Sequence, residues 1–397
     1  MGKKSNVHPD HYKTAGRGRQ GEDIVQTHEK RKLTRDPPRW TAQRRTREET
    51  PPKTQKEGDR PDAGTSGLTR PGDTVSHMKR EFGMVGLGRM GGSLALQALD
   101  KRMKVVGVTK GELRHELRQG GVIRTETVAG FRDALSPPRV IFIYVPAGRP
   151  VDTILDDLTP ALEPGDVIVD GGNSYWGDSI RRHRRLRERG LFFVDVGTSG
   201  GVEGARYGAC FMVGGEREAV ARIEPILREL AAAEGYVHAG GPGSGHFVKL
   251  VHNGIEFGML EAIGEGVDLL EQYDSDLDVA AVLRAWRHGS VIRSWLVDLM
   301  EAAYRSEGGL QRIPAYVEDT GEVNWLVTDA LHMEVPIPVI AASVMQLLAS
   351  RDRDKYWARA IAMMRHGFGE HPYGPDDAVM RVRRESRVGD FYCHRAP

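Results

Sequence analysis

Four polar side chains in one stretch have the types and the spacing for acid–base chemistry. Lys249, His252, Asn253 and Glu256 stand at positions i, i+3, i+4 and i+7. In a helix each residue advances about 100°, so these four lie within one arc about 100° wide. A cation, an imidazole, an amide and a carboxylate on one face suit a pocket for a polar, anionic substrate. The alternative is a solvated stripe in which Lys249 and Glu256 form an ordinary surface pair.

The other positions of this helix predict how it packs. They are apolar, and we expect them to be buried: Phe247, Val248, Leu250, Val251, Ile255, Phe257 and Met259. A surface helix usually has the narrower apolar stripe, so this pattern is inverted. The helix is predicted to run to about Tyr273, a length of roughly 45 Å. A helix of this length can serve two domains.

A glycine-rich turn follows the first predicted strand, residues 82–85. It reads Gly86-Leu87-Gly88-Arg89-Met90-Gly91, and a helical pattern and a second strand, Lys104–Val108, come after it. Between a strand and a helix, this spacing is the fingerprint of dinucleotide binding, because the glycines let a pyrophosphate approach a helix N-terminus. The sequence therefore predicts a Rossmann-type domain, with a plain glycine turn as the alternative.

The end of the second strand bears on the choice of cofactor. NAD-binding proteins usually carry an acidic residue there for the ribose 2′-hydroxyl. Residues 108–111 read Val-Thr-Lys-Gly, with no carboxylate. Thr109 and Lys110, with Arg114 nearby, suit a 2′-phosphate, so NADP is the predicted cofactor and NAD the alternative. Lys110 as a solvated turn residue is the other interpretation.

Further apolar segments alternate with helical stretches at residues 139–145, 167–170 and 191–196. This alternation predicts a doubly wound parallel sheet, whose ligands bind at the carboxyl ends of the strands. Asn173 and the turn Ser199-Gly200-Gly201 follow two of these strands. We expect them beside the nicotinamide, where they can hold a substrate carboxylate. For Gly171 and Gly172, a simple role in the turn is the alternative.

The second half of the chain has helical periodicity throughout. After a helix at residues 216–234 and the long helix, five more are predicted at 279–287, 291–304, 324–333, 338–349 and 356–364. The sequence thus predicts a Rossmann domain followed by an all-α domain, joined through a long helix. The predicted segments are a disordered basic extension (1–77), a dinucleotide-binding domain (78–243), a helical domain for substrate binding and dimerisation (244–373) and a tail (374–397).

The charge and composition of the chain bear on its possible partners. The 397 residues have a formal net charge of +1, so overall charge gives no reason to expect nucleic acid or an anionic membrane as partner. Residues 1–77 hold 17 Lys and Arg against 11 Asp and Glu and lack apolar periodicity. This segment is predicted to be disordered, either as a dispensable extension or as an RNA-binding arm.

The two cysteines, Cys210 and Cys393, are far apart and lack metal-ligand spacing, which argues against a disulfide framework and a zinc site. No run of about 18 apolar residues and no signal peptide is present. A soluble, cytoplasmic protein with unpaired thiols is therefore expected.

The sequence resembles the decarboxylating 6-phosphogluconate dehydrogenases, within the β-hydroxyacid dehydrogenases, from about Met84 to Tyr373. The generic superfamily shares the glycine motif, the Ser-Gly-Gly turn and the lysine with an asparagine four residues later. The His-Asn-Gly-Ile-Glu extension and a late Arg and His point to the phosphogluconate branch, in its shorter bacterial form. The motifs that carry the resemblance are residues 86–91, 170–174, 195–202, 245–256 and 365–371.

This resemblance implies oxidative decarboxylation of 6-phosphogluconate to ribulose 5-phosphate and carbon dioxide, with reduction of NADP or NAD, in the pentose phosphate pathway and gluconate utilisation. It implies Lys249 as the base at the 3-hydroxyl of the substrate and Glu256 as the acid that protonates C1 of the enediol left after decarboxylation, without a metal. His252, Asn253, Asn173 and the Ser199-Gly200-Gly201 turn would bind the substrate. Arg365 and His371 would reach its phosphate from the neighbouring subunit of a homodimer or a dimer of dimers. The cofactor would contact residues 86–91, Thr109, Lys110, Val145, Ala147 and Asn173.

Two positions depart from the family pattern. Phe257 replaces a tyrosine that usually hydrogen-bonds the substrate phosphate, so we expect weaker substrate binding or a substitute donor. Thr109-Lys110 differs from the Asp of NAD-using short forms and from the Asn-Arg of NADP-using long forms. Two other classes of function remain: a related oxidoreductase for a small 3-hydroxy acid, which should tolerate the loss of Arg365 and His371, and a non-catalytic NADP-binding or RNA-tethered regulator.

Overall fold

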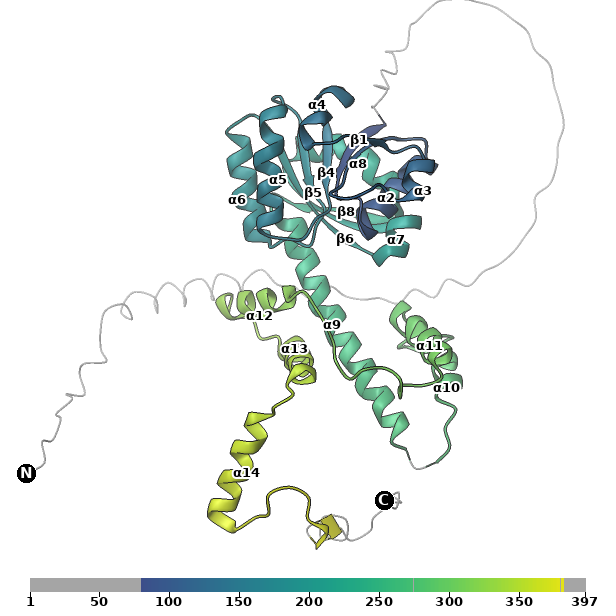
Figure 1. Ribbon diagram of the computed structural model, residues 1–397, viewed down its shortest axis with the longest axis vertical. Helices are drawn as coiled ribbons and strands as arrows, with labels where there is room; N and C mark the ends of the chain where they lie inside the picture. The colour runs from purple at the N-terminus through teal and green to yellow at the C-terminus, as the bar shows by residue number, and fades with distance from the viewer. Residues whose placement is uncertain (1–79, 274, 379, 382–397) are drawn as a thin grey trace, which may run out of the picture. The chain divides into compact units, whose positions relative to one another are not determined.

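The computed structural model describes residues 80–273, 275–378 and 380–381. The predictions for residues 1–77, for Cys393 and for most of the tail fall outside these residues. In the described part, an eight-stranded sheet comes first along the chain and a set of helices follows it (Figure 1). The strands are β1 (Glu81–Val85), β2 (Lys104–Val108), β3 (Ile123–Arg124), β4 (Val140–Ile143), β5 (Val167–Asp170), β6 (Phe192–Ser199), β7 (Ala209–Gly214) and β8 (Ala231–Gly240).

The strand order is β3-β2-β1-β4-β5-β6-β7-β8. The pairs from β3 to β6 are all parallel, which confirms the doubly wound sheet for this part. The sheet departs from the parallel pattern at β7, a strand for which no direction was predicted: it runs antiparallel to β6, while β8 is parallel to β7. The strand order reverses between β1 and β4, and ligands of open α/β sheets bind at such a switch point.

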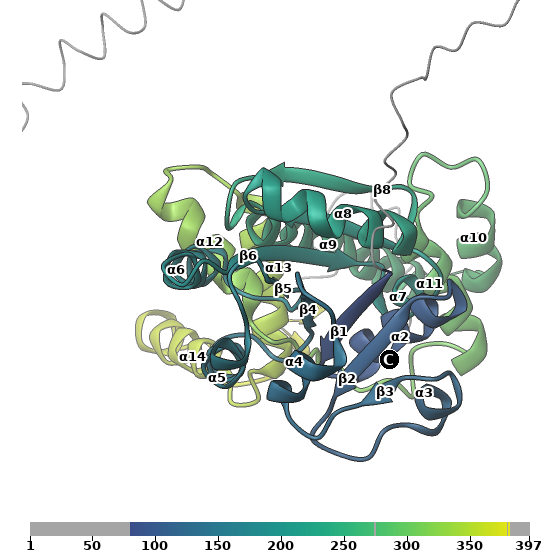
Figure 2. The ribbon, with the colours of Figure 1, turned by 90° about the horizontal axis from the view of Figure 1, so that it is seen from above.

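Helices cover both faces of the sheet (Figure 2). One core packs the sheet against α2 (Arg89–Asp100), α7 (Gly201–Tyr207) and α8 (Arg217–Leu230). The other core packs it against α4 (Phe131–Ala134), α5 (Arg149–Leu158) and α6 (Trp176–Arg187). Alternate residues of the central strands enter opposite cores, as the period of two in a strand requires. The short helix α3 (His115–Gln119) lies between β2 and β3 in the chain.

The predicted helix at 216–234 is too long at its C-terminal end. Helix α8 ends at Leu230, and β8 begins at Ala231. Alanines favour helix by local propensity, but Ala231 pairs with Ala209 of β7. Pairing with the sheet therefore decides the conformation of this segment, because tertiary contacts outweigh a weak local preference.

The long helix is confirmed as α9 (Ser244–Glu271), 28 residues. All five later helices are present: α10 (Val279–Trp286), α11 (Trp295–Glu307), α12 (Glu322–His332), α13 (Pro338–Arg351) and α14 (Tyr356–Gly369). Helix α11 begins later than predicted because the Ser294 hydroxyl accepts a hydrogen bond from the Val297 N–H and caps it. In the described part of the chain, none of the helices combines the length and the apolar character that a membrane span needs.

The predicted burial of α9 is only partly correct. Leu250 is 4% exposed and packs with Val323 and Leu326 of α12. Ile255, in contrast, is 54% exposed, and Val248 and Met259 are also exposed. Beyond its first turns α9 leaves the sheet, and α12 and α13 pack on only part of its circumference (Figure 1). The helical part therefore presents apolar side chains at its surface.

Candidate active site

The glycine loop after β1 has the shape that a dinucleotide needs. Gly86 has φ +91°, and a Cβ on it would lie 2.3 Å from the Tyr144 carbonyl oxygen. A Cβ on Gly91 would lie 2.1 Å from the Gly86 carbonyl oxygen, whereas Gly88, the N-cap residue of α2, faces open space. The first and third glycines thus permit close packing, and the second leaves room for a phosphate at the helix N-terminus.

The side chains of this loop divide between the core and the surface. Leu87 is buried in the sheet core, so only its backbone is available to a cofactor. Arg89 is exposed at the start of α2, and Met90 is partly buried. The predicted contact residues therefore offer backbone N–H groups and one exposed cation.

Cations also lie where the ribose is expected. Lys110 is exposed, and Thr109 is partly buried, directly after β2. Arg114 donates from Nη2 to the Gly88 carbonyl oxygen at 3.4 Å and forms a 3.0 Å ion pair with Glu116. This contact brings the Arg114 guanidinium to the glycine loop.

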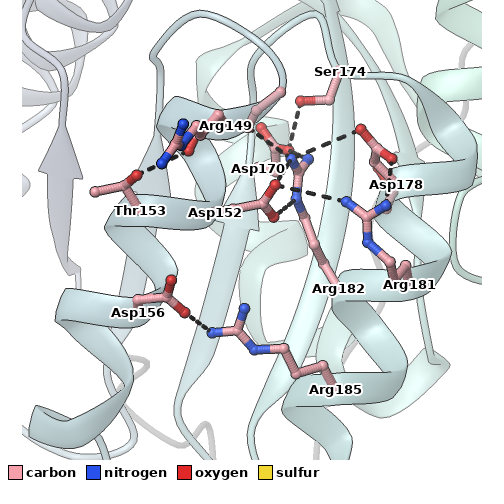
Figure 3. A network of polar contacts seen from close by, with 12 residues as sticks. Arg149, Asp152, Thr153, Asp156, Asp170, Ser174, Asp178, Arg181, Arg182 and Arg185 are labelled. Carbon is pink, nitrogen blue, oxygen red and sulfur yellow. Dashed lines mark hydrogen bonds and ion pairs between the residues drawn. The ribbon is translucent and has the colours of Figure 1, made fainter.

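A buried arginine connects the loops after β4 and β5 (Figure 3). Arg182 of α6 is 1% exposed. It donates to both carboxylate oxygens of Asp152 on α5 at 2.8 and 3.2 Å and to the Gly148 carbonyl at 2.9 Å. Its Nη1 donates to Asp170 Oδ2 at 3.3 Å. Asp170 also accepts hydrogen bonds from the Ser174 hydroxyl and the Gly172 N–H.

This Arg182 network holds two loops that the sequence predicts to be functional. Gly148 ends the loop that carries Val145 and Ala147, and its φ of +81° favours glycine. Asn173 stands between Gly172 and Ser174, both of which are bonded to Asp170. The predicted cofactor loop and the predicted substrate loop are therefore held by the same buried ion pair.

A buried carboxylate of the sheet accepts hydrogen bonds from the N-terminus of α9. Asp195 of β6 is fully buried and accepts hydrogen bonds from the backbone N–H groups of Gly243 at 2.7 Å and His246 at 2.9 Å. Burial raises the pKa of the Asp195 carboxyl, and these hydrogen bonds oppose the rise. A Cβ on Gly197 of β6 would lie 2.4 Å from the Lys249 Cβ. Glycine at this position lets the backbone of Lys249 approach the sheet.

The predicted substrate residues form one hydrogen-bonded chain. The Ser199 hydroxyl lies 3.0 Å from His252 Nε2, and His252 Nδ1 lies 3.2 Å from Asn253 Oδ1. Asn253 Nδ2 donates to Asn173 Oδ1 at 3.4 Å. Residues from β6, from α9 and from the loop after β5 therefore meet in one place.

In each of these hydrogen bonds, the donor and the acceptor follow from the groups that are able to donate. Asn253 uses its amide NH₂ group toward Asn173, so its oxygen faces His252 and can only accept. His252 then carries its proton on Nδ1, and in the neutral ring Nε2 accepts from the Ser199 hydroxyl. The Asn253 side chain is buried, and its oxygen and its NH₂ group each make a hydrogen bond in this series.

Lys249 lies partly buried on the same face of α9. Burial lowers the pKa of its ammonium group, and the charges of Glu256 and Glu322 oppose this fall. Glu256 Oε2 lies 3.8 Å from His252 Nδ1, and both side chains are partly exposed. The arrangement offers a lysine with a lowered pKa and a carboxylate on one face, as proton transfer in both directions requires.

Three site residues lie outside the predicted set. Tyr144 follows β4, and its ring packs against Gly171. Its hydroxyl lies 3.0 Å from Thr198 Oγ1, and burial raises the pKa of this hydroxyl. Arg182 and Glu322 are charged residues of helices, and no local motif distinguishes them. Helix α6 contains several arginines, and nothing in their spacing indicates that Arg182 is the buried one.

Phe257, in place of the expected tyrosine, packs at the edge of the cluster formed by α9, α12 and α13. Its ring therefore stabilises the helical packing.

Arg365 and His371 are not brought to the α9 stripe within one chain. Arg365 is exposed on α14, a helix without a buried residue, which extends away from the sheet (Figure 1). His371 accepts a hydrogen bond at its carbonyl oxygen from His366 Nδ1.

Family models cover most of the described part. The NAD binding domain of 6-phosphogluconate dehydrogenase matches residues 81–241, and the C-terminal domain of 6-phosphogluconate dehydrogenase matches residues 245–383. The chain is 44% identical over 292 residues to a Bacillus subtilis protein provisionally named 6-phosphogluconate dehydrogenase; the match covers 73% of this chain and 98% of that protein. It is 39% identical over 300 residues to an NAD(+)-dependent, decarboxylating 6-phosphogluconate dehydrogenase of Haloferax volcanii, covering 75% and 99%.

Solved structures agree with the sequence matches. The Plasmodium falciparum 6-phosphogluconate dehydrogenase, whose structures include complexes with NADP+ and with 6-phosphogluconate, superposes with a TM-score of 0.63 at 25% identity, over 75% of this chain and 66% of that one. A 3-hydroxyisobutyrate dehydrogenase of Salmonella typhimurium superposes with a TM-score of 0.59 at 19% identity, over 69% and 95%, a likeness of fold alone. Given its glycine loop, its α9 stripe and these matches, the chain belongs to the 6-phosphogluconate dehydrogenase family.

Proposed function

We propose that this protein is an NAD(P)-dependent dehydrogenase that oxidises and decarboxylates 6-phosphogluconate to ribulose 5-phosphate and carbon dioxide. The observation that carries the proposal is the hydrogen-bonded chain Ser199–His252–Asn253–Asn173 beside Lys249 and Glu256. It offers donors and acceptors for a polyhydroxylated acid next to a base and an acid. The relative from Haloferax volcanii is named as an NAD(+)-dependent, decarboxylating 6-phosphogluconate dehydrogenase, and the Plasmodium falciparum enzyme has been solved in complex with NADP+ and with 6-phosphogluconate.

Lys249 is the proposed general base. In its unprotonated form it takes the proton of the substrate 3-hydroxyl, and burial favours this form because it lowers the pKa of the ammonium group. The bound nicotinamide supplies the hydride acceptor for C3. After this step Lys249 is protonated and lies beside the new keto group, which it polarises.

Decarboxylation and reprotonation follow from the keto group. The bond from C1 to C2 breaks, its electron pair moves toward the C3 carbonyl, and carbon dioxide leaves. The C3 oxygen takes the proton held by Lys249, which gives the enediol. Glu256 then donates a proton to the carbon that has lost carbon dioxide, and Lys249 takes back the proton of the C3 hydroxyl as the ketone forms. The keto group accepts the electrons, so this scheme needs no metal.

The remaining predicted residues bind the substrate. Asn173, His252, Asn253 and the Ser199-Gly200-Gly201 turn contact its carboxylate and hydroxyls. Gly200 and Gly201 have φ values of +112° and +60°, and Gly201 faces open space. A substrate anion can therefore approach the backbone of this turn at Gly201.

NADP is the proposed preferred cofactor. Residues 109–111 present no carboxylate to a ribose, and Lys110 and Arg114 present two cations near the glycine loop. A 2′-phosphate would interact favourably with these charges. NAD use by the relative from Haloferax volcanii makes the comparison of both cofactors part of the test.

A homodimer is the proposed active form, with Arg365 and His371 reaching the substrate phosphate of the partner's site. The proposal is supported by the exposed apolar residues of α9 and by α14, which buries none of its residues within one chain. The domain limits at residues 243 and 373 and a cytoplasmic location stay predictions.

The test is an initial-rate assay of the purified protein with 6-phosphogluconate, comparing NADP with NAD. Cofactor reduction is followed by its absorbance, and carbon dioxide is measured in parallel. We expect equal amounts of reduced cofactor and carbon dioxide, and faster reduction of NADP. Reduction without carbon dioxide would contradict decarboxylation, and the absence of reduction with either cofactor would contradict the substrate.

A further inference from the structure

Glu322, the first residue of α12, faces the site from the helical part. Its Oε1 accepts a hydrogen bond from Asn253 Nδ2 at 3.4 Å, and its Oε2 accepts one from the Thr320 hydroxyl. Its charge also acts on Lys249. No sequence motif includes this residue, yet it touches the amide that binds substrate and lies within electrostatic reach of the base.

The carboxylate of Glu322 determines how Asn253 is oriented. An amide turned by 180° fills nearly the same space but exchanges its oxygen and its NH₂ group. A carboxylate accepts hydrogen bonds and cannot donate them, so Glu322 requires the NH₂ group on its side. The Asn253 oxygen must then face His252.

The orientation of Asn253 in turn determines the tautomer of His252. With the amide oxygen at 3.2 Å, His252 Nδ1 carries the proton, and Nε2 is free to accept from Ser199. Glu322 therefore acts through two side chains on the hydroxyl at the end of β6.

The groups around Lys249 show why this one carboxylate matters. Glu256 and His252 lie on α9 itself, Cys210 lies on β7, and the Asp195 carboxylate on β6 is occupied by N–H groups of α9. Among the charges that act on Lys249 in the described residues, Glu322 is the carboxylate that lies outside α9. Its charge reaches the lysine only when α12 packs on α9.

We propose that Glu322 is a positioning residue for the dehydrogenation: it orients Asn253 and His252, and its negative charge stabilises Lys249 after this lysine has taken the substrate proton. The inference deepens the proposed function and rests on it, because the base role of Lys249 belongs to that function.

The test compares the wild-type protein with Glu322→Gln and Glu318→Gln. Glu318 is a matched control, since it lies four residues earlier, is 73% exposed and contacts Tyr316 and Arg351. The measurement is the pH dependence of kcat/KM together with the KM for 6-phosphogluconate. In Glu322→Gln we expect the acidic limb to move to lower pH by about 0.5 to 1 unit, because a neutral side chain no longer favours the lysine ammonium.

The same variant should raise the KM for 6-phosphogluconate about tenfold, because glutamine permits both orientations of Asn253. Glu318→Gln should leave the limb and the KM unchanged. In Glu322→Asp the charge remains but the side chain is one methylene shorter, so the limb should stay near that of the wild type while the KM rises. This pattern separates the two roles and is not expected from a loss of α12 stability.

A Glu322→Gln profile and KM that coincide with those of the wild type would overturn the inference while the proposed function stands. An inactive wild-type protein would overturn both. Thermal unfolding of each variant, measured in parallel, identifies any change caused by misfolding. If Glu322→Gln is misfolded, the KM of Glu322→Asp decides the result, because this variant keeps the acidic first turn of α12.

Discussion

The sheet supplies one side of the candidate site, and the helices supply the other. The two sides differ in how completely one chain buries their side chains. On the sheet side, Arg182 and Asp170 are buried, and their bonds hold both loops in place. On the helix side, α9 carries the stripe, yet it exposes Ile255, and α14 buries none of its residues. The sheet side therefore buries its charged residues within the chain, whereas the helix side leaves apolar side chains exposed.

This difference has a physical cause. A doubly wound sheet has helices on both faces and buries its own polar loops, so it can hold ion pairs away from water. Single helices around one long helix cannot cover every apolar face. The sheet side should therefore respond to substitutions through stability, and the helix side through catalysis and assembly.

Lys249→Ala gives the largest expected effect. If Lys249 is the general base, turnover should fall by about two to four orders of magnitude, while the fold should remain because alanine favours the helical conformation of α9. Initial rates with 6-phosphogluconate, together with circular dichroism, measure both. Turnover close to that of the wild type would show that Lys249 is not the general base. The proposed catalytic role of the helix side would then be wrong.

Arg182→Met tests the sheet side. It leaves Asp170 buried without its partner, so we expect a loss of about 3–5 kcal/mol in the free energy of unfolding. The matched control is Arg185→Met on the same helix, since Arg185 pairs with Asp156 at the surface (Figure 3) and should change stability by less than about 1 kcal/mol. Denaturant unfolding followed by tryptophan fluorescence measures both variants. Equal stabilities of the two would contradict the structural role of the Arg182 network.

Arg365→Ala tests whether a second chain completes the helix side. Loss of a charge-assisted bond to the substrate phosphate should raise the KM about 30- to 100-fold. When Arg365→Ala and Lys249→Ala chains are refolded together in equal amounts, half of the dimers are mixed and each has one complete site. We expect about a quarter of the wild-type activity at low substrate concentration. A mixture no more active than its parts would mean that Arg365 acts within its own chain or not at all.

Lys110→Ala has the smallest expected effect. An exposed lysine paired with a 2′-phosphate is worth about 1 kcal/mol, so the KM for NADP should rise about fivefold while the KM for NAD stays the same. The measurement is the ratio of kcat/KM for the two cofactors. Unchanged KM values for both cofactors would indicate that Lys110 is only a solvated turn residue, and an equal rise for both would indicate a contact with a group that the two cofactors share.

Local pattern was enough for much of this protein. Gly86, Gly88 and Gly91 lie in one turn, so their spacing alone predicted the dinucleotide loop. The four polar residues of α9 lie within two turns of helix, so periodicity alone placed Lys249 and Glu256 on one face. The later helices also followed from periodicity, because their hydrophobic spacing is local.

What the sequence by itself determined was therefore a set of features whose residues lie close together along the chain: the strands β1, β2, β4, β5 and β6, the glycine loop, the long helix and its stripe. The tertiary structure alone decided the rest. Ala231 pairs with a strand 22 residues away instead of extending α8, and Arg182 lies 30 residues from Asp152. Glu322 reaches Asn253 across 69 residues. Such contacts depend on which surfaces pack together, and local spacing carries no information about that packing.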